Sequence, residues 1–92
     1  MPITTASEFE AVVGQMLVKI DKALYERGDP PKLKAARRDL VRVETIARDN
    51  AKLKEQRDAL AKTAETIRLE MSRDEALHND LWDLLDYIDY CT

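Results

Sequence analysis

The spacing of apolar residues predicts helices along almost the whole chain. In residues 6–27 apolar side chains recur at intervals of three and four, as in a helix that buries one broad face. These positions are Phe9, Val12, Val13, Met16, Leu17, Ile20, Ala23 and Leu24. Thr5 precedes Glu8 by three residues, and Ser7 precedes Glu10 by three, so two capping-box signatures place the helix start near residue 5 to 8. Gly28 suits the left-handed position after a helix end. We therefore expect a first helix at about 6–27.

A short connection separates the first predicted helix from the second. Asp29 is a suitable helix cap, and Pro30 suits the first helical position because its missing amide would have no partner there. So few linking residues place consecutive helices antiparallel. The sequence therefore predicts a helical hairpin, with the second helix beginning at about residue 30.

The long segment 31–73 has the pattern of a coiled coil. It contains no glycine and no further proline, and it is rich in strong helix formers. Apolar residues alternate at spacings of three and four, the a and d positions of about four heptads. The seam positions are Val43, Ile46, Asn50, Leu53, Arg57, Leu60, Ala64, Ile67 and Met71. We expect one helix over about 30–72.

Such a helix would be about twice as long as the first helix, so its distal half would lack cover. Either a second chain or the C-terminal segment of the same chain could cover this distal half. Asn50 and Arg57 at a positions would pair with their twins in a parallel dimer, or would lie at the edge of an antiparallel bundle.

The last segment predicts an acidic amphipathic helix at about 73–90. Ser72 precedes Glu75 by three residues, a second capping-box match, although a helix continuous with the preceding one stays possible. The apolar stripe with its flanking aromatic residues comprises Leu77, Leu81, Trp82, Leu84, Leu85, Tyr87, Ile88 and Tyr90. An acidic residue recurs every three positions, at Asp80, Asp83, Asp86 and Asp89. The expected fold is one all-α domain of three helices, which we expect to form a dimer.

Charge is divided unevenly along the chain. The net charge of the 92 residues is −3, but residues 32–73 carry +5 and residues 74–92 carry −6. A basic middle and an acidic end either attract each other or attract different partners.

The motifs in the chain argue against several classes of function. Glu75-x-x-His78 has the spacing used for metal ligands in di-iron bundles. His78 adjoins an acidic, solvent-facing run, however, so a surface histidine is the favoured interpretation. No phosphate loop or catalytic cluster is recognisable, and Cys91 is the single cysteine. We therefore expect no enzyme activity, cofactor or metal. With no apolar run of spanning length and no secretory signal, the cytoplasm is the expected compartment.

The segment Asn79–Leu85 resembles the acidic transactivation helices that insert Trp and Leu into a partner's groove. It also contains the Leu-x-x-Leu-Leu pattern of coactivator boxes. This resemblance implies that the stripe residues named above bind a partner protein. The alternative is that these leucines pack against the central helix of the same chain or of its twin.

Three functions are compatible with these patterns. The favoured one is a homodimeric protein–protein interaction module, an adaptor or regulator. The second is an acidic decoy, an inhibitor of a nucleic-acid-binding protein of the kind that phages and mobile elements encode, in which the aspartate row imitates phosphates. The third is nucleic-acid binding through the basic residues Lys32, Lys34, Arg37, Arg38, Arg42 and Arg48. The acidic total charge and the absence of interleaved aromatic residues disfavour the third.

Overall fold

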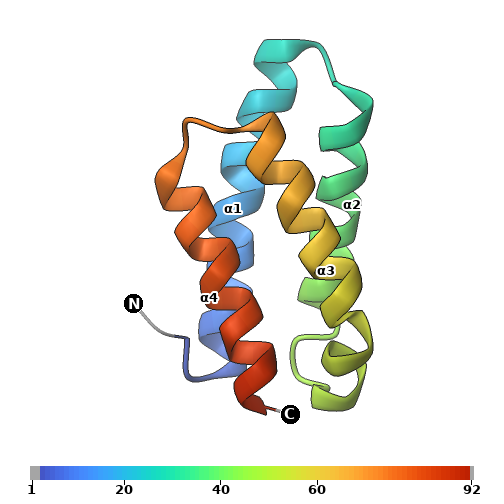
Figure 1. The fold of residues 1–92 in the computed structure, drawn as a ribbon, viewed down its shortest axis with the longest axis vertical. Coiled ribbons are helices and arrows are strands. Elements are labelled where there is room, and N and C mark those ends of the chain that lie inside the picture. Colours follow the sequence, from blue (N-terminus) through green and yellow to red (C-terminus); the bar gives the residue numbers. More distant parts are fainter. Residues whose placement is uncertain (1–2, 92) are drawn as a thin grey trace.

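Four helices run alternately up and down in residues 3–91, the part of the chain described by the computed structural model (Figure 1). They are α1 (Ala6–Arg27), α2 (Pro31–Thr45), α3 (Asn50–Glu70) and α4 (Glu75–Cys91). Both α1 and α3 pack against α2 and α4, so α1 lies diagonally opposite α3, and α2 opposite α4. The all-α fold class is confirmed, whereas the three-helix architecture is wrong.

The first hairpin forms where the sequence predicts it. Thr5 is the N-cap of α1, and its hydroxyl accepts a hydrogen bond from the Glu8 amide at 3.2 Å. Gly28 follows α1 in the left-handed conformation, with φ of 72°, and its amide donates to the Leu24 carbonyl. One detail differs from the prediction, because Pro31 and not Pro30 is the first residue of α2 and Asp29 makes no side-chain cap.

The predicted continuous helix over 30–72 is wrong, because the chain turns back at Ile46–Asp49. A straight helix over residues 31–73 would be roughly 65 Å long, whereas the longest extent of the bundle is 37 Å. Asp49 caps α3 by accepting a hydrogen bond from the Lys52 amide at 3.1 Å. Folding back is favoured because α3 then covers α2 within one chain, and each buries its apolar face on the other.

The predicted dimer seam contributes instead to the core of a single chain. Val43, Leu53, Leu60 and Ile67 are fully or almost fully buried. Ile46, Ala64 and Met71 are partly buried against the same core. Asn50 is exposed, and Arg57 lies at the surface beside α4. The apolar seam therefore needs no second chain for cover, and dimer formation stays a prediction.

The C-terminal helix folds back on its own chain, between α1 and α3 (Figure 1). Asp74, rather than Ser72, caps it, since the Asp74 carboxylate accepts a hydrogen bond from the Leu77 amide at 3.0 Å. On the α1 side the rings of Phe9 and Tyr87 lie 5.2 Å apart. α4 is thus the cover that the distal half of the predicted long helix required.

The two most strongly charged helices lie on opposite corners of the bundle. α2 carries five Lys/Arg against two Asp/Glu, whereas α4 carries five Asp/Glu and no Lys or Arg. These two helices do not pack against each other. The basic α2 therefore faces other surroundings than the acidic α4, whereas α3, the other half of the basic segment 32–73, packs against α4 and its Arg57 pairs with Asp89.

Candidate docking groove between α3 and α4

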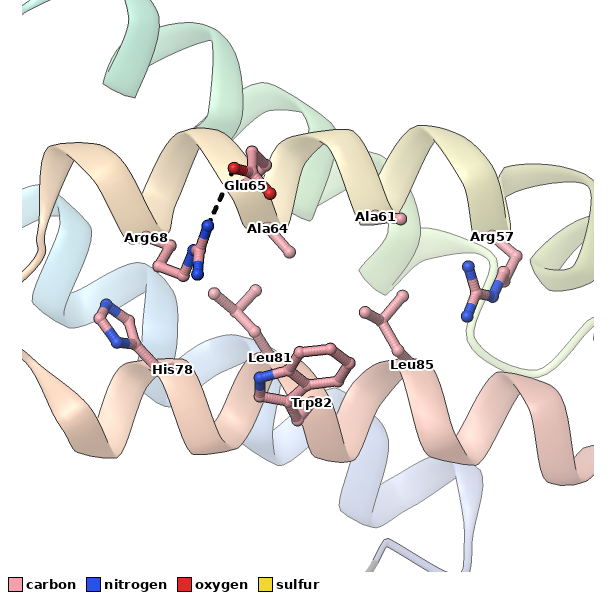
Figure 2. A pocket seen from close by; sticks show the side chains of 9 residues that line it. All are labelled: Arg57, Ala61, Ala64, Glu65, Arg68, His78, Leu81, Trp82 and Leu85. Atoms are coloured by element: carbon pink, nitrogen blue, oxygen red, sulfur yellow. Dashed lines mark hydrogen bonds and ion pairs between the residues drawn. The ribbon is translucent and has the colours of Figure 1, made fainter.

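An apolar groove of about 290 Å³ runs between α3 and α4 (Figure 2). We call it the α3–α4 groove. The residues that line it are Arg57, Ala61, Ala64, Glu65, Arg68, His78, Leu81, Trp82 and Leu85. Its volume is near the lower end of the range for ligand pockets, roughly 300–1,000 Å³. The groove is therefore suited to a few inserted side chains rather than to a large cofactor.

The groove exists because small residues on α3 face large residues on α4. Ala61 and Ala64 are one helical turn apart and point toward α4, while Leu81 and Leu85 point toward α3 (Figure 2). The two leucines are nearly fully buried and form the floor. Because alanine leaves space that a larger side chain would fill, the floor is open beside Trp82.

Trp82 lies along the outer edge of the groove (Figure 2). Its side chain is 63% exposed, although tryptophan is the largest apolar side chain in proteins and is highly buried on average. Trp and Arg are enriched among the residues that dominate binding energy at protein interfaces. The arrangement of Trp82 with Arg57 and Arg68 around an apolar floor is therefore typical of a docking site.

Charged pairs lie at both ends of the groove. At one end Arg57 donates two hydrogen bonds to Asp89, at 3.0 and 3.2 Å, and this pairing lowers the pKa of the Asp89 carboxyl. At the other end Arg68 donates to Glu65 at 3.0 Å. The two arginines lie on α3, and each is paired with a carboxylate, whereas the outer face of α4 carries the exposed Asp86 one turn after Trp82.

Most of the predicted partner-binding residues are buried in the core of the chain. Leu77, Leu81, Leu84, Leu85, Tyr87 and Ile88 belong to this buried set. Only Trp82 and Tyr90 are exposed, and Tyr90 is 85% exposed. The Leu-x-x-Leu-Leu leucines therefore pack inside the same chain, which corresponds to the alternative interpretation of this motif. The leucines cannot enter another protein's groove while the bundle is folded.

The four aspartates of α4 do not form a straight row. Residues spaced by three advance about 300° around a helix, so each aspartate is displaced by about 60° from the one before. Asp80 consequently lies toward α1, where burial raises the pKa of its carboxyl, although the nearby Lys19 opposes this shift. Asp89 lies on the opposite flank, paired with Arg57. The phosphate-like row that the decoy hypothesis requires is therefore wound around the helix.

The basic residues of the predicted nucleic-acid surface are divided among several surroundings. Arg37 pairs with Asp21 of α1, Arg48 with Glu10, and Arg42 lies 3.8 Å from Asp39 of its own helix. Lys32, Lys34 and Arg38 are exposed. Three of the six cations are thus in ion pairs, which reduces their charge available to phosphates.

The Glu75-x-x-His78 motif is not part of a metal cluster in the structure. His78 Nε2 lies 3.0 Å from the carbonyl oxygen of Met71, the C-cap residue that follows α3. Among residues 3–91, no three His, Cys, Asp or Glu side chains are grouped closely enough to hold a metal ion. His78 therefore joins the end of α3 to the first turn of α4.

Sequence reasoning assigned the groove residues of α3 to other roles. Arg57 and Ala64 were placed in the dimer seam, and Ala61, Glu65 and Arg68 received no binding role. The available signal was the pair of alanines spaced by three opposite the large residues of α4. It could be interpreted only once α3 and α4 were known to lie side by side.

Comparison with protein-family models, curated proteins and solved structures finds no match to this chain. Among the described residues, no helix combines the length and the apolar character that crossing a membrane requires.

Proposed function

We propose that the protein is a non-enzymatic interaction module that binds an amphipathic helical segment of another protein in the α3–α4 groove. The observation that carries this proposal is Trp82, a large exposed side chain at the edge of an apolar groove. An inserted helix would cover Trp82 and place a few apolar side chains over Leu81 and Leu85.

The charges around the groove define the chemistry of the partner. The α3 rim presents Arg57 and Arg68, whose charge a partner's carboxylates would share with Asp89 and Glu65, whereas the exposed face of α4 presents Asp86. A complementary helix has an apolar stripe with acidic residues along one edge and basic residues along the other. Such charges fix the orientation of the partner and add to its affinity.

Synthetic helices can test this chemistry directly. The first probe has a leucine stripe with glutamate along one edge and lysine along the other, and the control probe has glutamine along both edges. Trp82 is the only tryptophan, so its fluorescence reports cover of the groove without a label. We expect the charged probe to shift the Trp82 emission to the blue at lower concentration than the control does. If neither probe changes the emission at millimolar concentration, the groove does not bind helices.

Matched variants locate the natural partner's binding site. Trp82→Ala removes the exposed edge, and Ala61→Gln fills the groove with a polar side chain while preserving helix propensity. Tyr25→Ala is the control, because Tyr25 is 91% exposed on α1, away from the groove. We expect a protein retained from source cells by the wild type and by Tyr25→Ala to be lost with both groove variants. If the groove variants retain the same proteins, the proposal is wrong.

The salt dependence of this binding separates the groove from the decoy alternative. Binding that depends on exposed aspartates should weaken steeply as ionic strength rises, because salt screens exposed charges. Binding that depends on apolar side chains inserted beside Trp82 should be much less sensitive to ionic strength. We expect the measured affinity to show the weaker dependence.

A further inference from the structure

The turn at Ile46–Asp49 contains no residue that prevents a helix from continuing. It has neither glycine nor proline, and the positive φ angles in residues 3–91 are those of Gly28 and Asp29. Ile46 and Asp49 have φ angles of −106° and −111°. The backbone of this turn can therefore become helical without removing any residue that requires the bent conformation.

The hydrogen bonds of the turn are local and can be replaced. The amides of Ile46 and Ala47 donate to carbonyls three residues earlier, both at 3.3 Å, and the Asp49 amide donates to Ile46 at 2.9 Å. A continuous helix would replace these bonds with bonds to carbonyls four residues earlier, and it would also pair the terminal groups of α2 and α3. What the straight form loses is the Asp49 cap and the Arg48–Glu10 ion pair, which joins the turn to α1.

The apolar pattern crosses the turn without interruption. Val43, Ile46, Asn50 and Leu53 keep the alternating spacing of three and four that continues to Met71. In a straight helix these residues would lie along one seam. The sequence thus favours a form in which α2 and α3 are one helix, while the fold of the single chain favours the bent form.

We propose that the Ile46–Asp49 turn is a hinge that straightens, so that two copies of the chain exchange their α3–α4 hairpins and form a swapped homodimer. The α1–α2 and α3–α4 contacts stay within each chain, while α2–α3 and α1–α4 contacts form between chains. Each half of the dimer then repeats the four-helix core of the monomer. This inference is independent of the proposed function, because it concerns contacts between identical chains.

Specific contacts that span the two hairpins become contacts between chains in this dimer. They include the Thr63 hydroxyl donating to Asp39 at 3.0 Å, and Arg27 donating to Glu70 at 3.0 Å. Lys19 and Asp74 also join the two hairpins, at 3.6 Å. The exchange preserves all of these interactions, so its cost is confined to the hinge and to the association of two chains.

Two substitutions move the hinge in opposite directions. Asp49→Ala removes the cap of α3 and improves helix propensity, so it favours the straight form. Asn50→Pro favours the bent form, because residue 50 is the first helical position of α3 and Asp49 before it is already extended. In a continuous helix the same proline would lie in the interior and break it.

Sedimentation velocity over micromolar to millimolar concentrations tests the proposal, using chains refolded at high concentration. We expect a concentration-dependent dimer for the wild type and a dissociation constant roughly ten-fold or more lower for Asp49→Ala, because two caps are lost per dimer. We expect Asn50→Pro to stay monomeric. If all three are monomeric at the highest concentration, or if Asn50→Pro dimerises as the wild type does, the proposal is wrong.

Cross-linking distinguishes a swapped dimer from two folded monomers that associate face to face. Cysteines are introduced as Lys19→Cys and Asp74→Cys in a Cys91→Ser background, and are joined with a short bis-maleimide. We expect isolated dimers to give covalent dimers on denaturing gels, and isolated monomers to give a link within one chain. If the cross-links in the dimer fraction join only cysteines of the same chain, the proposal that the hairpins are exchanged is wrong.

Discussion

The two turns that flank α2 reverse the chain equally well but for different reasons. The turn after α1 contains Gly28 in a left-handed conformation and Pro31 at the start of α2. The turn after α2 contains Ile46, Ala47 and Arg48, which are all compatible with a helix. The first reversal is therefore imposed by local backbone preference, whereas the second depends on Asp49 and on the burial of α3 against its neighbours.

This difference shows that a helix can end where no residue requires it to end. Within a single chain, Leu53, Leu60 and Ile67 are buried because α3 folds back along α2 and accepts α4 on its other side. Burying a leucine side chain contributes roughly 2 kcal/mol, more than the helix preference of Ile46, Ala47 or Arg48. Tertiary packing therefore determines the second turn.

The largest effect should follow from removing the burial that holds α3 in place. Leu60→Ala leaves a cavity at a residue that is almost fully buried, so we expect a loss of about 2–5 kcal/mol in the free energy of unfolding. Leu69→Ala is the control on the same helix, because Leu69 is 69% exposed. Chemical denaturation measures both. Equal, small effects would show that the core does not hold the second turn.

The next effect tests the first turn. Gly28→Ala places a side chain at φ of 72°, although nothing lies within 4 Å of the added Cβ, so we expect a loss of about 1–2 kcal/mol from backbone strain alone. Gly14→Ala is the matched control inside α1, where the new Cβ would meet Glu44 at 3.9 Å, an ordinary contact. It should stabilise the protein by about 0.4–1 kcal/mol. Thermal unfolding gives both values, and a neutral Gly28→Ala would contradict a turn imposed by the backbone.

A smaller loss is expected at the cap of the second turn. Asp49→Ala leaves the Lys52 amide without its 3.1 Å partner, so we expect a loss of about 1 kcal/mol at concentrations where the chain is monomeric. Asp58→Ala, a substitution of an exposed aspartate within α3, should change stability by less than about 0.5 kcal/mol. Denaturant titrations of the two variants should therefore differ, and indistinguishable midpoints would exclude a role for the cap.

The smallest effect concerns the Arg57–Asp89 pair, which joins α3 to α4. The hydrogen bonds from Arg57 lower the pKa of the folded Asp89 carboxyl below its usual range. Such a pair stabilises the fold at pH values above the unfolded pKa, about 3.9, and this contribution is lost as pH falls through the lower folded pKa. Asp89→Asn should therefore reduce the melting temperature slightly at neutral pH and not at strongly acidic pH. A difference that persists in acid would indicate that the pair does not act through charge.

Local signals in the sequence predicted the beginning and end of α1, the first reversal and a separate acidic C-terminal helix. Thr5 and Gly28 act on backbone groups within a few residues, so their effects can be inferred without knowing the rest of the fold, whereas the first residue of α2 is Pro31 and not the predicted Pro30. The same reasoning placed the second helix correctly at its start but not at its end. The heptad pattern of Val43 to Met71 was real, but it described residues that face a core, without specifying which chain supplies the other side.

Recognising the candidate groove depended on tertiary structure more than predicting the helices did. The exposed Trp82 was identified from sequence, because it flanks the apolar stripe of α4. Ala61 and Ala64 could not be recognised as the opposite wall until α3 and α4 were placed side by side (Figure 2).

The sequence by itself therefore determined the all-helical class, the first hairpin and the amphipathic character of α4, because periodicity and capping are short-range properties. Only the tertiary structure decided that α3 turns back at Ile46–Asp49, that α4 covers it within the same chain, and that a groove stays open beside Trp82. The physical reason is that an apolar stripe shows that a helix face is buried, but not which surface covers it. The covering surface depends on how the whole chain folds.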